Sequence, residues 1–271
     1  MGRAQRLAWA SYLFLWFWSV PLLALDLVPP GGEAMASVML ILPGALAGWR
    51  LLERGGRPGR AAGWLVIGAI LVGSWAVEHL GVTSGWPFGR YRYEGVLLPT
   101  LVGVVPLAIP FAWLLVVPGA LELARLLLPR APLPVLGLLG ATLAMLLDMV
   151  IEPVAVYVNG YWTWLDAGPF YGIPTANFIA WWVVSALFCV LLLLYLRPAW
   201  RAEPQPALDL PAMLYLLNLA LFTVVDLARG QPGAGLLGLA LLGACLAVLR
   251  WRGHRLRAAL PPLALLRRAA R

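Results

Sequence analysis

The feature that most constrains this chain is a series of apolar segments, each long enough to cross a lipid bilayer as a helix. A bilayer-spanning helix needs roughly 20 mostly apolar residues. We do not expect the first segment to be a cleavable signal peptide, because its apolar run is too long and no small-residue cleavage site follows it. The sequence therefore predicts an all-α polytopic membrane helical bundle with residues 1–250 as one transmembrane domain. The eight expected helices lie at about 7–28, 34–52, 61–82, 97–121, 133–157, 176–196, 211–228 and 233–250.

Composition supports this class and excludes several others. Hydrophobic residues make up 62% of the chain and charged residues 12%, whereas soluble domains carry about 25% charged residues. This excludes an ordinary soluble enzyme, a disordered protein and a disulfide scaffold. All 20 basic residues are arginine, so mechanisms that need a lysine amine, such as Schiff-base or phosphate-loop chemistry, are also excluded.

The few cysteines and histidines argue against a metal centre. Cys189 and Cys245 are far apart in the sequence, and there is no CxxC motif. His79 and His254 are the only histidines. A structural zinc site, an iron–sulfur cluster, a haem and a di-metal centre are therefore not expected.

The arginines lie almost entirely on one side of the expected helices. If the N-terminus is cytoplasmic, 17 of the 20 arginines fall in cytoplasmic segments, and only Arg90, Arg92 and Arg229 fall outside. This asymmetry follows the positive-inside rule and predicts a multi-pass protein of the cell membrane with both termini in the cytoplasm. Residues 251–271 are expected to form a basic cytoplasmic tail that lies on anionic membrane lipids. Because the arginines flank apolar helices, the net charge of +8 does not indicate a nucleic-acid partner.

Two connections on the opposite side are rich in aromatic residues, glycine and proline. They read HLGVTSGWPFGRYRYEGVLLP (79–99) and VNGYWTWLDAGPFYGIPTANF (158–178). Taken one by one, their tyrosines and tryptophans are typical of the aromatic belt at a membrane interface. Here the aromatic residues alternate with turn residues over two long stretches, which favours folded caps over simple anchors.

Five acidic residues share the outer halves of the odd-numbered expected helices. Ionisable groups inside a membrane are energetically costly, so each of them indicates a functional site. Their common depth predicts one polar pocket that opens toward the outer leaflet beneath the two aromatic loops. The five acids are Asp26, Glu78, Asp148, Glu152 and Asp226.

Asp148 and Glu152 are the most informative of these acids. They are four residues apart and therefore share one helix face. Asp148 lies near the middle of the membrane, where desolvation disfavours the charged form, so we expect it to be neutral or strongly paired. A neutral buried acid is what a proton donor to a weak base requires. Asp26 and Asp226 are closer to the interface, where a carboxylate can also reach water or cap a helix.

The stretches around the two loops resemble a known family. They read EHLGVTSGWPFGRYRYEGVLLPTLVGVVPLAIPFAW (78–113) and DMVIEPVAVYVNGYWTWLDAGPFYGIPTANFIAWW (148–182), and they cover about a quarter of the chain. Both resemble membrane carotenoid biosynthesis proteins of the carotenoid 1,2-hydratase type. That group includes gamma-carotene, lycopene and bisanhydrobacterioruberin hydratases.

The resemblance implies a reaction and its components. Water would add across the terminal 1,2 double bond of an acyclic (psi) carotenoid end group and give a tertiary 1-hydroxyl. The resemblance implies no redox step and no organic cofactor, and it implies a carotenoid substrate that enters from the lipid phase. It leaves open whether other carotenoid pathway enzymes are partners.

This chemistry can be matched to residues of the chain. Asp148 or Glu152 would protonate C2, and Glu78 would handle the water that captures the tertiary cation at C1. Aromatic faces would stabilise that cation without attacking it. The candidate substrate-binding residues are His79, Trp86, Phe88, Arg90, Tyr91, Trp162, Trp164, Tyr171, Asn177, Asp26 and Asp226. Arg90 and Arg92 are expected to pair with Glu94 or with the pocket acids.

Two other functions are compatible with the residues. A transporter or lipid-binding protein would use the outer acids as a proton or cation relay. Such a protein is expected to carry a second polar cluster toward the inner side, where we find only Glu122, which we expect to pair with Arg125. A cyclase-like carotenoid enzyme also begins by protonating a polyene. It differs in that the substrate chain, rather than water, captures the cation.

Overall fold

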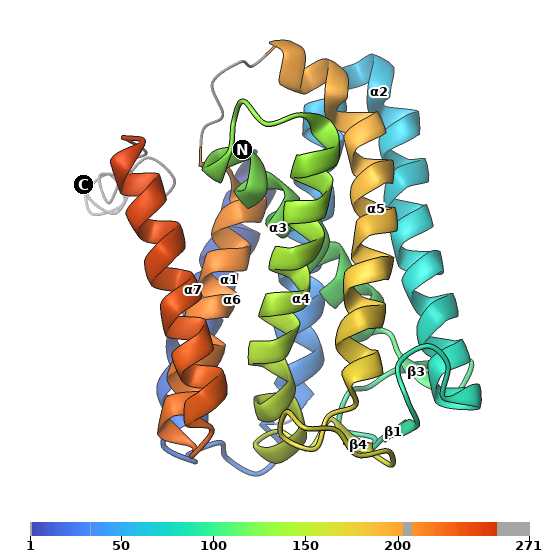
Figure 1. Ribbon diagram of the computed structural model, residues 1–271, viewed down its shortest axis with the longest axis vertical. Coiled ribbons are helices and arrows are strands. Elements are labelled where there is room, and N and C mark those ends of the chain that lie inside the picture. The colour runs from blue at the N-terminus through green and yellow to red at the C-terminus, as the bar shows by residue number, and fades with distance from the viewer. Residues whose placement is uncertain (1, 33, 203–207, 254–271) are drawn as a thin grey trace.

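A computed structural model of the protein describes residues 2–32, 34–202 and 208–253 and shows an upright bundle of helices (Figure 1). The predicted helical bundle is confirmed, because eight helical segments of the described residues are long and apolar enough to cross a membrane. The helices are α1 (Arg3–Ala24), α2 (Ala34–Ser84), α3 (Ala108–Leu127), α4 (Leu133–Tyr157), α5 (Thr175–Ala202), α6 (Leu210–Ala228) and α7 (Pro232–Trp251). Most of the predicted basic tail lies outside the described residues.

Helix α2 accounts for two of the eight segments, Ala34–Gly55 and Gly59–Ser84. In a straight helix, residues 52 and 63 would be about 16 Å apart, since each residue rises about 1.5 Å. Yet a Cβ atom added at Gly63 would lie 2.9 Å from Cδ2 of Leu52. The chain therefore reverses direction within α2, and its two arms lie side by side. The glycine-rich stretch around residue 57, which joins the two arms, is helical.

Helix α3 is the central helix of the bundle. In its most apolar 18-residue window, 89% of the residues are buried, the largest share of any described helix. Close packing depends on small residues, because Cβ atoms at Gly44 and Gly119 would collide with the backbone carbonyl oxygens of Phe111 and Pro211. These contacts bring α2 and α6 against α3.

The predicted start of the fourth helix at residue 97 is wrong. Helix α3 begins at Ala108, because the residues before it form a short hairpin in which β2 (Thr100–Leu101) pairs with β3 (Val105–Pro106). Val102 and Gly103 turn the chain between these strands with positive φ angles of 51° and 71°. Positive φ is incompatible with a right-handed helix.

The end of the first helix also differs from the prediction. Helix α1 ends at Ala24, and Asp26 follows it with a φ angle of 57°. The Asp26 carboxylate is 80% exposed and lies 2.7 Å from Nη1 of Arg229. Asp26 therefore lies beyond the membrane-spanning helix and is not an intramembrane acid.

The two aromatic connections are folded, as predicted, and they form one unit. Strand β1 (Tyr91–Tyr93) from the first connection pairs antiparallel with β4 (Trp162–Trp164) from the second. Backbone hydrogen bonds from Glu94 N to Tyr161 O and from Leu165 N to Arg90 O extend the pairing. We call residues 85–107 and 158–174 the cap. The cap lies at one end of the bundle, and α1 begins and α7 ends at the other, arginine-rich end (Figure 1).

Candidate functional site

A cavity lies beneath the cap and extends into the bundle. The space within it, including the part open to the outside, is about 760 Å³, and it is lined by residues of α2 to α6 and of the cap. Its polar wall contains Glu78, Asp148, Glu152 and Asn177, and the deeper wall includes Asn218 and Phe222. The aromatic side chains that the cap contributes are Phe88, Tyr91, Tyr93, Tyr161, Trp162 and Trp164. The site therefore combines carboxyl groups with an aromatic lining.

Glu78 accepts three hydrogen bonds from neutral groups. Its Oε2 atom accepts from the hydroxyls of Tyr91 at 2.6 Å and Tyr93 at 2.9 Å, and its Oε1 atom accepts from Nε1 of Trp113 at 3.0 Å. Burial raises the pKa of the Tyr91 and Tyr93 phenols far above the ordinary value, and the Glu78 carboxyl raises it further. Both phenols are therefore protonated donors to Glu78.

Glu152 and Asp148 are joined by one amide. Oε2 of Glu152 accepts from Nε1 of Trp162 at 3.1 Å and from Nε1 of Trp164 at 2.9 Å. The Nδ2 group of Asn177 donates to Oε1 of Glu152 at 3.3 Å and to Oδ2 of Asp148 at 3.0 Å. Among the described residues, Glu152 thus has three neutral donors, whereas Asp148 has the Asn177 amide alone. Asn177, a candidate substrate-binding residue, holds the two carboxyl groups in one position.

The register of the cap explains how four aromatic donors reach two acids. Tyr91 is opposite Trp164, and Tyr93 is opposite Trp162. Side chains alternate between the two faces of a strand, so these four rings share the face that lines the cavity. The ring centroids of the opposite pairs are 5.0 Å and 6.1 Å apart. The period-two patterns Tyr-x-Tyr and Trp-x-Trp agree with this arrangement, but three residues are too few to predict a strand from the sequence alone.

The arginines of the cap pair with exposed acids. Arg92 lies 2.9 Å from Oε1 of Glu94, as expected, and Arg90 lies 2.7 Å from Oδ1 of Asp166. Hydrogen bonds from Arg90 hold the pKa of Asp166 below its ordinary value. Within the described parts of the chain, no ion pair involves any of the three cavity acids. The expectation that a cap arginine pairs with a pocket acid is therefore wrong.

The three cavity acids are buried, with exposed fractions of 6% for Glu78, 3% for Asp148 and 2% for Glu152. Buried carboxyl groups without a cationic partner are held neutral or as hydrogen-bonded anions. The arrangement can therefore exchange protons with a bound molecule. Among the described residues, no group of three or more histidine, cysteine or acidic side chains is placed to hold a metal ion.

Several candidate residues lie outside the cavity wall. Trp86 is 67% exposed, and the ring of His79 packs against Trp75 at 5.4 Å. The Tyr171 hydroxyl accepts a hydrogen bond from the backbone N–H of Gly233 at 2.8 Å, which joins the cap to α7. None of these three candidates is among the residues that line the cavity.

Asp226 is also separate from the cavity. It is fully buried in α6, but it does not line the cavity. Within the described residues, neither of its carboxyl oxygens has a hydrogen-bond partner. The expectation that all five outer acids share one pocket is therefore wrong, because Asp26 and Asp226 lie elsewhere.

Sequence reasoning missed Tyr93, Trp113 and Trp181. Trp113 donates to Glu78, and its ring stacks on Trp181 with centroids 3.7 Å apart and an interplanar angle of 6°. Both tryptophans lie in apolar runs, where a buried aromatic residue is ordinary core. Only the long-range contact with Glu78 distinguishes Trp113 from core.

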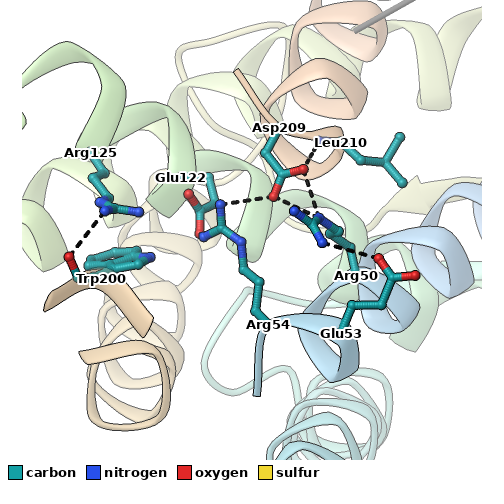
Figure 2. Close-up of polar contacts among 8 residues, drawn as sticks. All are labelled: Arg50, Glu53, Arg54, Glu122, Arg125, Trp200, Asp209 and Leu210. Carbon is teal, nitrogen blue, oxygen red and sulfur yellow. Dashed lines mark hydrogen bonds and ion pairs between the residues drawn. The ribbon is translucent and has the colours of Figure 1, made fainter. Parts of the chain in front are cut away.

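A second polar cluster lies at the arginine-rich end (Figure 2). Arg54 forms ion pairs with Glu122 and, at 2.9 Å, with Oδ2 of Asp209. Arg50 lies 2.8 Å from Oδ1 of Asp209 and 3.1 Å from Oε2 of Glu53. We call these five residues the inner cluster. It ties the first arm of α2 to α3 and to the start of α6, where Asp209 also caps the helix.

The expected pairing of Glu122 with Arg125 is found in part, because Arg125 acts on Glu122 as a nearby positive charge. The ion pair of Glu122 is with Arg54. The guanidinium of Arg125 stacks over the ring of Trp200 at 4.6 Å and donates to the Trp200 carbonyl oxygen at 3.4 Å (Figure 2). The partner of Glu122 could not be inferred from spacing, because Arg54 is distant in the sequence.

Comparison with known proteins assigns the chain to a family. A family model described as "Carotenoid biosynthesis protein" matches residues 35–245. The chain is similar to the bisanhydrobacterioruberin hydratase of Haloarcula japonica, with 38% identity over 135 residues, which is 49% of this chain and 45% of the relative. The match thus covers less than half of the relative's length. No solved structure matches the chain.

Proposed function

The chain belongs to the carotenoid biosynthesis protein family, and from this premise we propose that it is a carotenoid hydratase of the cell membrane. The observation that carries the proposal is the group of three buried acids, held by neutral donors beneath an aromatic cap. The similar protein of Haloarcula japonica is named a hydratase. The proposed reaction is water addition across the terminal 1,2 double bond of an acyclic carotenoid end group, which gives a tertiary 1-hydroxyl. The enzyme would act as a hydro-lyase without a redox cofactor.

Asp148 is the proposed proton donor. Hydrogen bonds to a carboxylate favour its charged form, whereas desolvation and a neighbouring carboxylate favour the neutral form. Within the part of the chain that the structure describes, Glu152 has three donors and Asp148 one, so a single proton shared by this pair is placed on Asp148. The two acids act as a coupled pair. Asn177 keeps them together and leaves the second oxygen of Asp148 for a ligand.

The reaction can be written with its atoms balanced. The π electrons of the 1,2 double bond take the proton from Asp148, which forms a C2–H bond and leaves a tertiary cation at C1. The oxygen of a water molecule bonds to C1, and the Glu78 carboxylate takes the proton that this water releases. Transfer of that proton from Glu78 to Asp148 restores the starting state. No electron is gained or lost by the protein.

The aromatic lining suits a carbocation. The faces of the stacked Trp113 and Trp181 and of the cap tryptophans attract positive charge but contain no strong nucleophile. Farther from the cap, the apolar residues Leu40, Val116 and Phe222 line the same cavity. They suit a hydrocarbon chain that enters from the lipid phase.

Pigment chromatography tests the proposed activity. The gene is expressed in a host that makes lycopene, and the host without the gene is the control. We expect a more polar carotenoid that, in water labelled with deuterium and oxygen-18, carries deuterium at C2 and oxygen-18 at C1. A less polar cyclised isomer would indicate a cyclase, and an oxygen atom derived from O₂ would contradict hydration.

Amide substitutions test the assignment of the acids. General acid–base groups contribute about 10²–10⁴-fold to rate, so Asp148→Asn, Glu152→Gln and Glu78→Gln are each expected to reduce the product at least about 100-fold. Asp26→Asn is the matched control, because it removes an exposed acid at the same end of the molecule. Full product from all three cavity variants would falsify the assignment.

A transporter is the second candidate, because the inner cluster supplies a second polar group that such a protein needs. Its acids are ion-paired with arginine, which makes a relay less suitable than a structural role. Reconstitution in vesicles that contain a pH-sensitive dye distinguishes the two. Proton uptake without any change in the carotenoids of the host would favour transport.

A further inference from the structure

A groove at the arginine-rich end is not explained by the proposed function. It lies between the ends of α3, α4 and α5 and is open to the outside. Three arginines line it, Arg125, Arg197 and Arg201, together with Trp200. The rest of its lining is apolar and includes Leu133 and Leu136. No acidic residue is among the described residues that line it, and the three arginines give this part of the groove a positive charge.

The arginines of the groove are arranged for a common ligand. Arg197 and Arg201 are four residues apart on α5 and therefore share one helix face. Both are exposed, and neither forms an ion pair within residues 2–32, 34–202 and 208–253. Arg125 is only 4% exposed, and its stacking on Trp200 fixes the guanidinium at the wall of the groove. Arginine is well suited to phosphate, because its planar guanidinium donates two parallel hydrogen bonds.

An exposed apolar stripe leads from the membrane to these arginines. Val183, Leu187, Val190 and Leu194 are spaced at three or four residues along α5, and each is exposed by 45% to 69%. The same spacing continues to Arg197 and Arg201, so all six side chains lie on one face of the helix. An apolar stripe that ends in cations matches a molecule with acyl chains and an anionic headgroup.

We propose that this groove binds the phosphate group of an anionic phospholipid, whose acyl chains lie along the exposed stripe of α5. Basic pockets between transmembrane helices at the cytoplasmic side are suited to anionic headgroups. The apolar stripe favours a lipid over free phosphate, which would use the arginines alone. The site lies at the opposite end of the bundle from the cap, so it is separate from the proposed hydratase site.

Lipid titration of the purified full chain in detergent tests this proposal. Short-chain phosphatidylglycerol, phosphatidylcholine and inorganic phosphate are added separately, and bound lipid is counted by native mass spectrometry. We expect phosphatidylglycerol to bind more tightly than phosphatidylcholine, and inorganic phosphate not to displace it. The variant Arg197→Gln/Arg201→Gln is expected to weaken phosphatidylglycerol binding about 30-fold, since each arginine near an anionic surface contributes on the order of 1 kcal/mol.

The matched control is Arg3→Gln/Arg250→Gln, which removes two exposed arginines at the same end but outside the groove. It is expected to retain the wild-type affinity. Equal weakening in both double variants would overturn the proposal, because it would indicate general attraction to anionic lipid. Displacement by inorganic phosphate, or equal affinity for phosphatidylcholine, would overturn the lipid assignment as well. Arg197 and Arg201 are exposed, so their substitution leaves the buried core unchanged.

Discussion

The two ends of the bundle bury acidic residues in opposite ways. Beneath the cap, Glu78 and Glu152 accept hydrogen bonds from tyrosine, tryptophan and asparagine. At the arginine-rich end, Glu122 and Asp209 are paired with arginines. An arginine keeps its partner ionised, because the guanidinium itself does not lose its proton. Neutral donors leave a carboxyl group able to change its protonation state.

This difference separates acids that stabilise the fold from acids that transfer protons. An acid that must hold helices together gains from a permanent charge pair, whereas an acid that must give and take a proton cannot have one. Glu152 and Glu122 are the same residue type and are equally buried, with exposed fractions of 2%, so their partners decide the role. The following variants test this separation, from the largest expected effect to the smallest.

Loss of Arg54 is expected to have the largest effect on stability. Arg54→Gln removes the ion-pair partner of buried Glu122, and breaking a buried ion pair on one side costs about 3–5 kcal/mol. We expect a strongly lowered Tm in detergent, with unchanged product per folded molecule. The double variant Arg54→Met/Glu122→Leu is expected to recover most of the Tm, because apolar replacement removes both charges. An unchanged Tm in Arg54→Gln would contradict the structural role.

Removal of the indole donors is expected to affect activity instead. Trp162→Phe/Trp164→Phe keeps aromatic rings in the cavity but removes both N–H groups that bind Glu152. Each hydrogen bond to a charged group contributes about 1.5–3 kcal/mol, so loss of both is expected to lower the product per folded molecule by about 100-fold or more. The control Trp64→Phe/Trp251→Phe changes two exposed tryptophans and should retain activity. Equal activity in both double variants would show that the indole N–H groups are dispensable.

A smaller loss of activity is expected when Glu78 loses one hydrogen-bond donor. Tyr93→Phe removes one of three donors, and the hydroxyl of Tyr91 and the indole of Trp113 still hold the carboxylate. Loss of one hydrogen bond to a charged group is expected to lower the rate about 10-fold. The measurement is the initial rate of product formation. Tyr157→Phe, which removes an exposed phenol beside the cap, serves as the control. A rate equal to wild type would mean that Tyr93 only packs.

The smallest effect is expected at the exposed pair of Arg90 and Asp166. Because its folded-state pKa is lowered, Asp166 stabilises the cap above its ordinary pKa of 3.8, and this contribution is lost as pH falls through the lowered value. Wild type should therefore have a slightly higher Tm than Asp166→Asn near pH 6. The two curves should converge in strong acid. A constant difference across this range would exclude the ion pair as its cause.

Local patterns predicted the membrane architecture well. Long apolar segments and flanking arginines are properties of contiguous sequence, so the helical bundle and most helix positions could be inferred. The four-residue spacing of Asp148 and Glu152 also correctly predicted a shared helix face. The clearest boundary error, at residue 97, arose where an apolar run contains Pro99, Gly103 and Pro106, which favour a hairpin over a helix.

Long-range pairing is what the sequence could not provide. The cap joins strands of three residues each, which are too short for a periodic signal and lie about 70 residues apart in the chain. For the same reason, the ion pair of Arg54 with Glu122 and the hydrogen bond of Trp113 to Glu78 could not be predicted from the sequence. It also led us to place Asp26 and Asp226 in the pocket, since equal depth in the membrane does not bring helices together.

The most direct test of the account compares Asp148→Asn with Glu122→Gln in the same carotenoid-producing host. Hydroxylated carotenoid per folded molecule and Tm are measured for both variants. The account predicts that Asp148→Asn loses at least about 99% of the product and keeps the wild-type Tm, whereas Glu122→Gln keeps the product and lowers the Tm. Full product from Asp148→Asn, or loss of product from Glu122→Gln at an unchanged Tm, would contradict it.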